Sequence, residues 1–145
     1  MPVPPKEFLH LLSEVIPFNK FLGITVDHAA EGHVVLKLPY RPELIGDASR
    51  PALHGGAIST LIDVAGGFAV WTQLAGIEDR VSTIDLRVDY LAPAAPQDLL
   101  AEAKIVRVGN RVGVVDVRCW QPSTPDRAVA TGKAVYNIKR KEDSP

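Results

Sequence analysis

The chain has 145 residues, of which 46% are hydrophobic and 23% charged, as in an ordinary globular domain. Its formal net charge of -1 leaves no surplus of positive charge to neutralise phosphates, which argues against a general nucleic-acid binder. The single cysteine, Cys119, excludes an intramolecular disulfide and fits a reducing compartment. We therefore expect a cytoplasmic protein that folds as one domain over residues 1–145.

The first predicted element is a short amphipathic helix at residues 4–16, "PPKEFLHLLSEVI", opened by prolines and ended by Pro17. The first ten residues lack the basic and apolar regions of a secretory signal peptide. Residues 24–30 and 33–40 then predict two strands joined at "EGH". Residues 41–52, rich in Pro, Gly and Asp, predict a loop.

The segment "LHGGAISTLIDVAGGFAV" at residues 53–70 predicts a long buried helix, because it is apolar nearly all round. Its one charged residue, Asp63, also argues against a membrane span. At about 3.6 residues per turn, the helix has a core stripe and a second stripe of small or polar residues. The core stripe is Ile58, Leu61, Ile62, Ala65 and Ala69; the second is Gly56, Ser59, Thr60, Asp63, Gly66 and Gly67. Two glycines inside a helix cost about 1 kcal/mol each against alanine, so we expect something to approach the second stripe closely.

Four more strands are predicted at residues 80–91, 98–108, 111–120 and 127–138, with a two-residue hairpin at Gly109-Asn110. Cys119 falls within this alternating pattern and is expected to be a buried structural thiol. The charged tail at residues 139–145 is expected to fray. In the first of these strands, strict alternation puts Ser82, Ile84, Leu86, Val88 and Tyr90 on one face and Val81, Thr83, Asp85, Arg87 and Asp89 on the other.

Strands around one long helix predict an α+β fold with the helix buried on a sheet. One six-stranded sheet covers only one face of so apolar a helix. The other face therefore requires the sheet to wrap, a second subunit, or both.

Asp63 has three interpretations. It could point to solvent, it could be a buried structural aspartate paired with an arginine, or it could be a functional carboxylate. The helix has no other charged residue to form a solvated face, which weakens the first interpretation. A carboxylate beside the N–H groups of a helix N-terminus suits a general base or nucleophile in acyl transfer.

The motif "HGGAISTLID" at residues 54–63 resembles the signature of the hotdog-fold acyl-CoA thioesterases of the phenylacetate-pathway (PaaI-like) type. "IPFNKFLGITV", "STIDLRVDYLAPA" and "AVATGKAVYNI" resemble further stretches of that family, so the resemblance runs from about Ile16 to Ile138. It implies a hotdog fold, in which a curved antiparallel sheet wraps a long central helix, here with a short N-terminal helix. It also implies a homodimer or homotetramer that hydrolyses an acyl-CoA to a free acid and coenzyme A.

The resemblance assigns roles to four residues. Asp63 matches the catalytic carboxylate, which activates water or attacks the thioester. Gly56 matches the residue whose backbone N–H polarises the thioester carbonyl, and His54 matches a motif histidine that more often shapes the loop than carries a proton. Thr83 matches a hydroxyl residue that reaches the site from the partner subunit, with Ser82 as its neighbouring candidate.

Further residues are expected to contact the substrate. Gly55 belongs to the same motif. Many relatives carry an Asn or Gln in the loop before it, where Asp47 is the nearest polar residue here. Arg107 and Arg111 flank the hairpin and could meet the phosphates of coenzyme A. Candidates for the acyl pocket are the aromatic residues Phe18, Phe21, Phe68 and Trp71.

The sequence leaves two alternatives to a thioesterase on the same fold: a non-catalytic acyl-CoA or acyl-carrier binding protein, and a dehydratase. The presence of both Asp63 and Gly56 disfavours the first. His54 with Asp63 is a poor match to the histidine–acid pair of the second. The scattered histidines show no metal-ligand spacing, so we expect neither a metal nor a cofactor.

Overall fold

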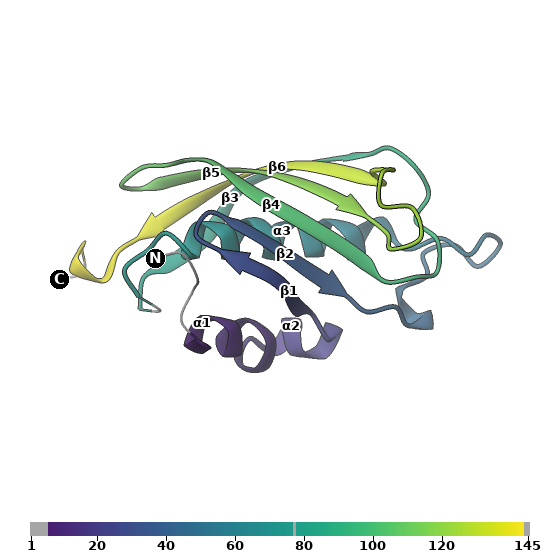
Figure 1. Cartoon of the computed structure of the whole chain (residues 1–145), viewed down its shortest axis with the longest axis horizontal. Coiled ribbons are helices and arrows are strands. Elements are labelled where there is room, and N and C mark those ends of the chain that lie inside the picture. The colour runs from purple at the N-terminus through teal and green to yellow at the C-terminus, as the bar shows by residue number, and fades with distance from the viewer. Residues whose placement is uncertain (1–5, 77, 144–145) are drawn as a thin grey trace.

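The computed structural model describes residues 6–76 and 78–143. Six strands form one curved antiparallel sheet in the order β1-β2-β4-β5-β6-β3, and the long helix α3 lies along its concave side (Figure 1). The strands are β1 Thr25–Ala30, β2 His33–Leu38, β3 Arg80–Tyr90, β4 Leu99–Val108, β5 Val112–Trp120 and β6 Ala130–Lys139, and the helix is α3 Gly55–Trp71. This arrangement confirms the predicted α+β architecture of a long central helix wrapped by a curved sheet.

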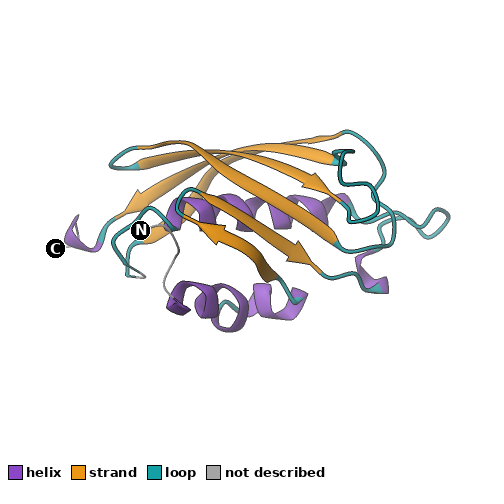
Figure 2. Cartoon of the chain, viewed as in Figure 1, coloured by secondary structure: helices purple, strands orange, loops and turns teal. Residues whose placement is uncertain are grey.

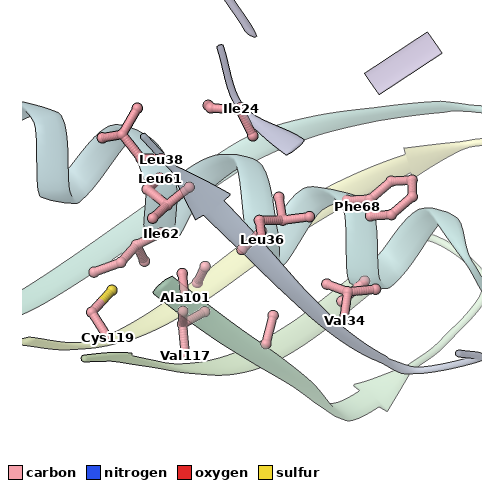
Figure 3. Close-up of a cluster of buried hydrophobic side chains, with 14 of the residues drawn as sticks. Ile24, Val34, Leu36, Leu38, Leu61, Ile62, Phe68, Ala101, Val117 and Cys119 are labelled. Carbon is pink, nitrogen blue, oxygen red and sulfur yellow. The ribbon is translucent and has the colours of Figure 1, made fainter. Parts of the chain in front are cut away.

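The core lies between α3 and the sheet. All five residues of the predicted core stripe of α3 are buried. Figure 3 shows Leu61 and Ile62 of the helix beside Leu36 of β2 and Cys119 of β5. Cys119 is fully buried, which confirms the predicted buried thiol, and this burial raises its pKa to about 12. No helix in the described ranges is long and apolar enough to cross a lipid bilayer.

The N-terminal segment is longer and more broken than predicted. It consists of α1 Lys6–His10, a π-helical turn Leu11–Val15 and a second helix, α2 Pro17–Leu22. Pro17 does end the first stretch, but it also begins α2, where a fixed φ and a missing N–H are tolerated. The expected opening prolines at residues 4 and 5 lie outside the described residues.

These N-terminal helices supply a cover for α3 that the sequence analysis did not consider. Figure 2 shows α3 lying between them and the strands β5 and β6. The Phe8 ring meets Trp71 of α3 edge to face, with 5.3 Å between the ring centroids. Both Phe8 and Leu12 are almost fully buried. One chain therefore covers two faces of its own central helix.

Strand β3 departs from the predicted alternation. Its pairing with β6 shifts between Thr83 and Asp85, which leaves Ile84 as an extra residue that is 57% exposed. A β-bulge of this kind exchanges the two faces of a strand. Thr83 faces α3, and beyond the bulge Leu86 and Val88 pack on that same side. The prediction that Thr83 lies opposite Leu86 and Val88 is therefore wrong.

Two predictions at the sheet end also need correction. The β4–β5 hairpin forms, but its connection holds residues 109–111, and neither Gly109 nor Asn110 has the positive φ of a two-residue hairpin turn. The tail is not frayed over residues 139–143. Arg140 donates hydrogen bonds to the carbonyls of Gly109 and Asn110, and a 3-10 turn follows at Lys141–Asp143. Residues 144–145 lie outside the described residues.

Candidate functional site

Asp63 lies half-buried in the middle of α3 and faces strand β3. The Thr83 hydroxyl donates a hydrogen bond of 2.6 Å to the Asp63 carboxylate. Because the bulge follows directly after Thr83, it keeps this hydroxyl turned toward the helix. Asp63 forms no ion pair with any described residue, so the interpretation as an arginine-paired structural aspartate finds no support within the chain.

The contact between Thr83 and Asp63 forms within one chain. The expectation that Thr83 reaches Asp63 from a partner subunit is therefore wrong. Its neighbour Ser82 is exposed and pairs with Asn137 of β6. Alternation along the strand turns Ser82 away from the side on which Thr83 meets Asp63.

Tyr136 of β6 explains the two glycines inside the helix. A Cβ atom at Gly66 would overlap the Tyr136 hydroxyl, and one at Gly67 would lie 3.3 Å from its ring. The hydroxyl donates a hydrogen bond of 2.7 Å to the backbone carbonyl of Asp63. Burial, together with the nearby Asp63 carboxylate, raises the pKa of Tyr136 far above its usual value. The expected close approach is thus made by a neutral tyrosine of the same chain.

Asp63, Thr83 and Tyr136 line a cleft of about 260 Å³ between α3, β3 and the N-terminal helices. Its other walls are mostly apolar and are formed by Leu12, Ile16, Asn19, Val64, Gly67, Phe68, Trp71 and Val81. We call this hollow the Asp63 cleft. Its shape offers an apolar group a place beside an oriented carboxylate.

Two polar residues of this cleft, Tyr136 and Asn19, were not among the site residues predicted from the sequence. Asn19 is only 4% exposed and its amide donates a 3.0 Å hydrogen bond to the carbonyl of Leu12. An amide among the mostly apolar residues 16–24 was a weak signal, because no helix was predicted at residues 17–22. For Tyr136 the signal was weaker, because nothing local links it to a helix 73 residues away.

The four aromatic candidates for the acyl pocket divide into two pairs. Phe68 and Trp71 line the Asp63 cleft. Phe18 and Phe21 are 54% and 66% exposed and stack on each other, with 6.4 Å between ring centroids. Neither of these two lines the cleft, because the helix α2 turns them outward.

The His-Gly-Gly motif forms the N-terminus of α3. His54 is the N-cap residue, and its Nδ1 accepts a 2.7 Å hydrogen bond from the Gly56 backbone N–H. The Tyr90 hydroxyl donates to the Gly55 carbonyl at 3.0 Å. Gly56 and Asp63 are seven residues apart on one helix, which separates them by about 10 Å along its axis. The Gly56 N–H and the Asp63 carboxylate of one chain therefore do not meet at one site.

Asp47 lies in the loop before this motif, and the loop packs against His54 at Gly46. The Asp47 carboxylate accepts hydrogen bonds from the backbone and side chain of Ser49 and from Arg50. These donors, led by the Ser49 hydroxyl, lower the Asp47 pKa to about 2. The carboxylate is thus occupied within its own loop.

Arg107 and Arg111 are both exposed at the β4–β5 hairpin, and neither lines the Asp63 cleft. The structure therefore does not bring them to Asp63. Within residues 6–76 and 78–143, no three His, Cys, Asp or Glu side chains gather as metal ligands would.

The fold and the cleft together define a hotdog protein with an oriented carboxylate beside an apolar cavity. The model of the thioesterase superfamily matches residues 51–128. A Halobacterium salinarum protein whose name marks it as an inferred esterase is 40% identical over 126 residues, covering 83% of each chain. The medium/long-chain acyl-CoA thioesterase YigI of Escherichia coli is 33% identical over 135 residues, covering 85% of this chain and 86% of its own.

Among solved structures, the Escherichia coli PaaI protein matches with a TM-score of 0.81 over 93% of both chains, at 21% identity, which speaks for the fold alone. The chain belongs to the thioesterase superfamily, as the family match and the relatives show. It is an enzyme of the thioester hydrolase class.

Proposed function

We propose that the protein hydrolyses an acyl-CoA thioester at the Asp63 cleft. The observation that carries this proposal is the 2.6 Å hydrogen bond that orients the Asp63 carboxylate at the wall of an apolar cavity. The E. coli relative is named for medium and long acyl chains, and the apolar walls of the cleft suit such a chain.

Two chemical routes are open to Asp63. As a general base, it takes a proton from a water whose oxygen attacks the thioester carbon. The tetrahedral intermediate then breaks its C–S bond, and Asp63 returns the proton to the leaving thiolate, which releases acid and thiol. As a nucleophile, its oxygen displaces the thiol to form a mixed anhydride, which water then hydrolyses. Repeated turnover in ¹⁸O-labelled water identifies the nucleophilic route when ¹⁸O appears in the Asp63 carboxylate, which happens only when water attacks the Asp63 carbon of the anhydride.

The thioester carbonyl needs a hydrogen-bond donor as its oxygen gains charge. Gly56 is the expected donor, but it lies about 10 Å along the helix from Asp63 of the same chain. Its N–H is bonded to His54 Nδ1, so the thioester oxygen has to replace or share that acceptor. We propose that the partner's Gly56 supplies the N–H in a homodimer. Each of its two sites then joins Asp63 and Thr83 of one chain to the α3 N-terminus of the other.

The edge of the sheet supports this dimer. Strand β3 has a hydrogen-bonded neighbour on one side only, and three exposed apolar residues gather along it. These are Ile84, Tyr90 and Leu91, each more than half exposed. The unpaired edge from Ile84 onward, where these residues lie, is a ready surface for a second copy, and it leaves the Arg80 end of the strand free. The expected substrate contacts of Asp47 and Gly55, at the same end of α3, then belong to the partner's site.

Asp63→Asn tests the catalytic assignment. Turnover of a medium- and long-chain acyl-CoA panel, followed by free thiol, should fall by about 10² or more while the fold and substrate binding are kept. Asp85→Asn, two residues beyond Thr83 on β3, is the matched control and should keep wild-type turnover. Activity of Asp63→Asn within a few-fold of wild type would remove Asp63 from the mechanism.

The same panel of acyl-CoA esters also tests the alternative that the protein binds acyl-CoA without hydrolysing it. That alternative predicts tight binding of acyl-CoA with slow hydrolysis of every ester, in wild type and Asp63→Asn alike. The Thr83 hydroxyl on Asp63 favours the hydrolase, because binding alone needs no oriented carboxylate. The cytoplasmic location stays a prediction.

A further inference from the structure

A second hollow continues the Asp63 cleft around the edge of the sheet. Ile16, Trp71 and Val81 line both hollows, so the two adjoin each other at these side chains. The second has a volume of about 570 Å³ and is completed by Asp79, Arg80, Ser82, Asn137 and Lys139. We call it the edge groove. Its polar lining differs from the apolar walls of the cleft.

Two cations lie side by side in the edge groove. Arg80 and Lys139 are directly paired across β3 and β6, and both are exposed. Neither forms an ion pair with a described residue. Like charges placed opposite each other on a sheet repel, so this pair favours an anion between them.

The acids nearby form no ion pair with either cation. Asp79 is 7% exposed, and its two carboxylate oxygens accept the backbone N–H groups of Lys141 and Ala75. Glu78 is paired with the Lys141 ammonium. Both carboxylates are thus occupied by the C-terminal turn and its surroundings.

The same two strands contain a second cation pair for comparison. Arg87 and Lys133 are also directly paired across β3 and β6. There Asp89 lies 3.3 Å from Arg87, and Asp116 lies 3.1 Å from Lys133. The protein therefore neutralises one of the two cation pairs with its own acids and leaves the pair beside the cleft open.

We infer that the edge groove receives the arm of the thiol carrier and that Arg80 and Lys139 bind its phosphate groups. This inference rests on the proposed function. Arg80 lies three residues before Thr83 on β3, so their Cα atoms are about 10 Å apart along the strand. The Arg80 side chain lies on the opposite face from Thr83, which lengthens the path around the sheet edge. The path between them passes Trp71 and Val81.

Polar side chains in the middle of the edge groove suit the polar groups in the middle of the coenzyme A arm. The arm that links the thioester to the phosphates of coenzyme A contains two amide groups. Ser82 and Asn137 are cross-strand partners in the groove, and their hydroxyl and amide can both donate and accept hydrogen bonds. In this proposal Ser82 still contacts the substrate, as expected from the sequence, but it contacts the coenzyme A arm and lies away from the Asp63 carboxylate.

The test compares two thioesters of one acyl group: the coenzyme A ester and the N-acetylcysteamine ester, which has no phosphate. In Arg80→Ala/Lys139→Ala we expect the KM for the coenzyme A ester to rise about tenfold or more, with kcat nearly unchanged. The KM for the N-acetylcysteamine ester should stay at the wild-type value. Arg87→Ala/Lys133→Ala, the neutralised pair on the same strands, is the matched control and should change neither.

Each other outcome overturns the inference. An equal rise in KM for both esters would give the cations a structural role, and no change for either would remove them from binding. A rise confined to acyl groups that end in a carboxylate would assign the anion to the acyl chain. If the KM for the coenzyme A ester rose in Arg107→Ala/Arg111→Ala and not in Arg80→Ala/Lys139→Ala, the phosphates would be bound at the hairpin.

Failure of the proposed function gives a separate result. If wild-type protein hydrolyses neither ester, calorimetry with coenzyme A and with pantetheine still tests the groove. Coenzyme A should bind more tightly than pantetheine to the wild type and to the control variant. In Arg80→Ala/Lys139→Ala this preference should be lost.

Discussion

The Thr83 hydroxyl orients the Asp63 carboxylate through one hydrogen bond. It touches Asp63, not the substrate, so we assign it the role of a positioning residue. Its hydrogen bond restricts the two side-chain torsions of Asp63 at the wall of the cleft. Such positioning adds to catalysis because the reacting groups are held near attack geometry before the substrate arrives.

Thr83→Val removes the hydroxyl and keeps the branched shape of the side chain. We expect kcat for an acyl-CoA to fall about tenfold or more, with a loss of about 1 kcal/mol of stability for the missing hydrogen bond. Thr83→Ser retains the hydroxyl and should recover most of the activity. If the serine variant is as impaired as the valine variant, the hydroxyl is not what Thr83 contributes.

Helix α3 and strand β6 are fitted to each other at Gly66. The Tyr136 ring occupies the space that a side chain at this position would need. The two glycines therefore lower the intrinsic helix propensity of α3 so that β6 can approach its backbone. This contact fixes the position of the Asp63 backbone relative to β6, because the Tyr136 hydroxyl donates a hydrogen bond to the Asp63 carbonyl.

Gly66→Ala should lower the free energy of unfolding by about 1–3 kcal/mol, since the added methyl group overlaps Tyr136. Urea denaturation would measure this loss. In a Tyr136→Phe background the same substitution should cost less, because the overlapping oxygen is gone. Gly76→Ala is the control, as nothing lies within 4 Å of a Cβ there. Equal costs for Gly66→Ala in both backgrounds would show that the hydroxyl does not set the fit.

As a whole, one chain encloses its central helix but holds only part of the proposed catalytic apparatus. The N-terminal helices and the sheet cover α3, while the exposed edge of β3 and the distance from Gly56 to Asp63 leave the site open to a second copy. Light scattering should therefore find at least a dimer in solution. A strictly monomeric, active protein would contradict the shared site.

Mixed dimers test which residues come from which chain. Asp63→Asn and Gly56→Pro should each be impaired. Proline suits the first turn of a helix, but its Cβ here requires the His54 ring to shift, so circular dichroism must first show that the variant is folded. Refolded together, they should regain activity well above the mean of the parents, because one site per mixed dimer then receives both intact residues.

Asp63→Asn refolded with Thr83→Val is the matching control. These two residues meet within one chain, so every site keeps a defect and mixing should restore nothing. Rescue in this control pair, or its absence in the first pair with mixed dimers confirmed by mass spectrometry, would refute the assignment of residues to chains.

Much of the architecture followed from local patterns in the sequence. The apolar segment at residues 53–70 predicted α3, and alternation predicted five of the six strands to within two residues at each end. Asp63 stood out because it is the one charged residue in that helix. These inferences succeed because the burial of a helix or strand leaves its period in the sequence.

The contacts of the site depended on the tertiary structure. The bulge at Ile84 exchanged the faces of β3, and no periodic pattern marks such an inserted residue. Thr83 meets Asp63 across 20 residues, and Tyr136 meets its backbone across 73. The open pair Arg80 and Lys139 likewise exists only through the register of β3 on β6. The sequence determined which segments bury a face, whereas strand register and close packing between distant segments determined which side chains meet.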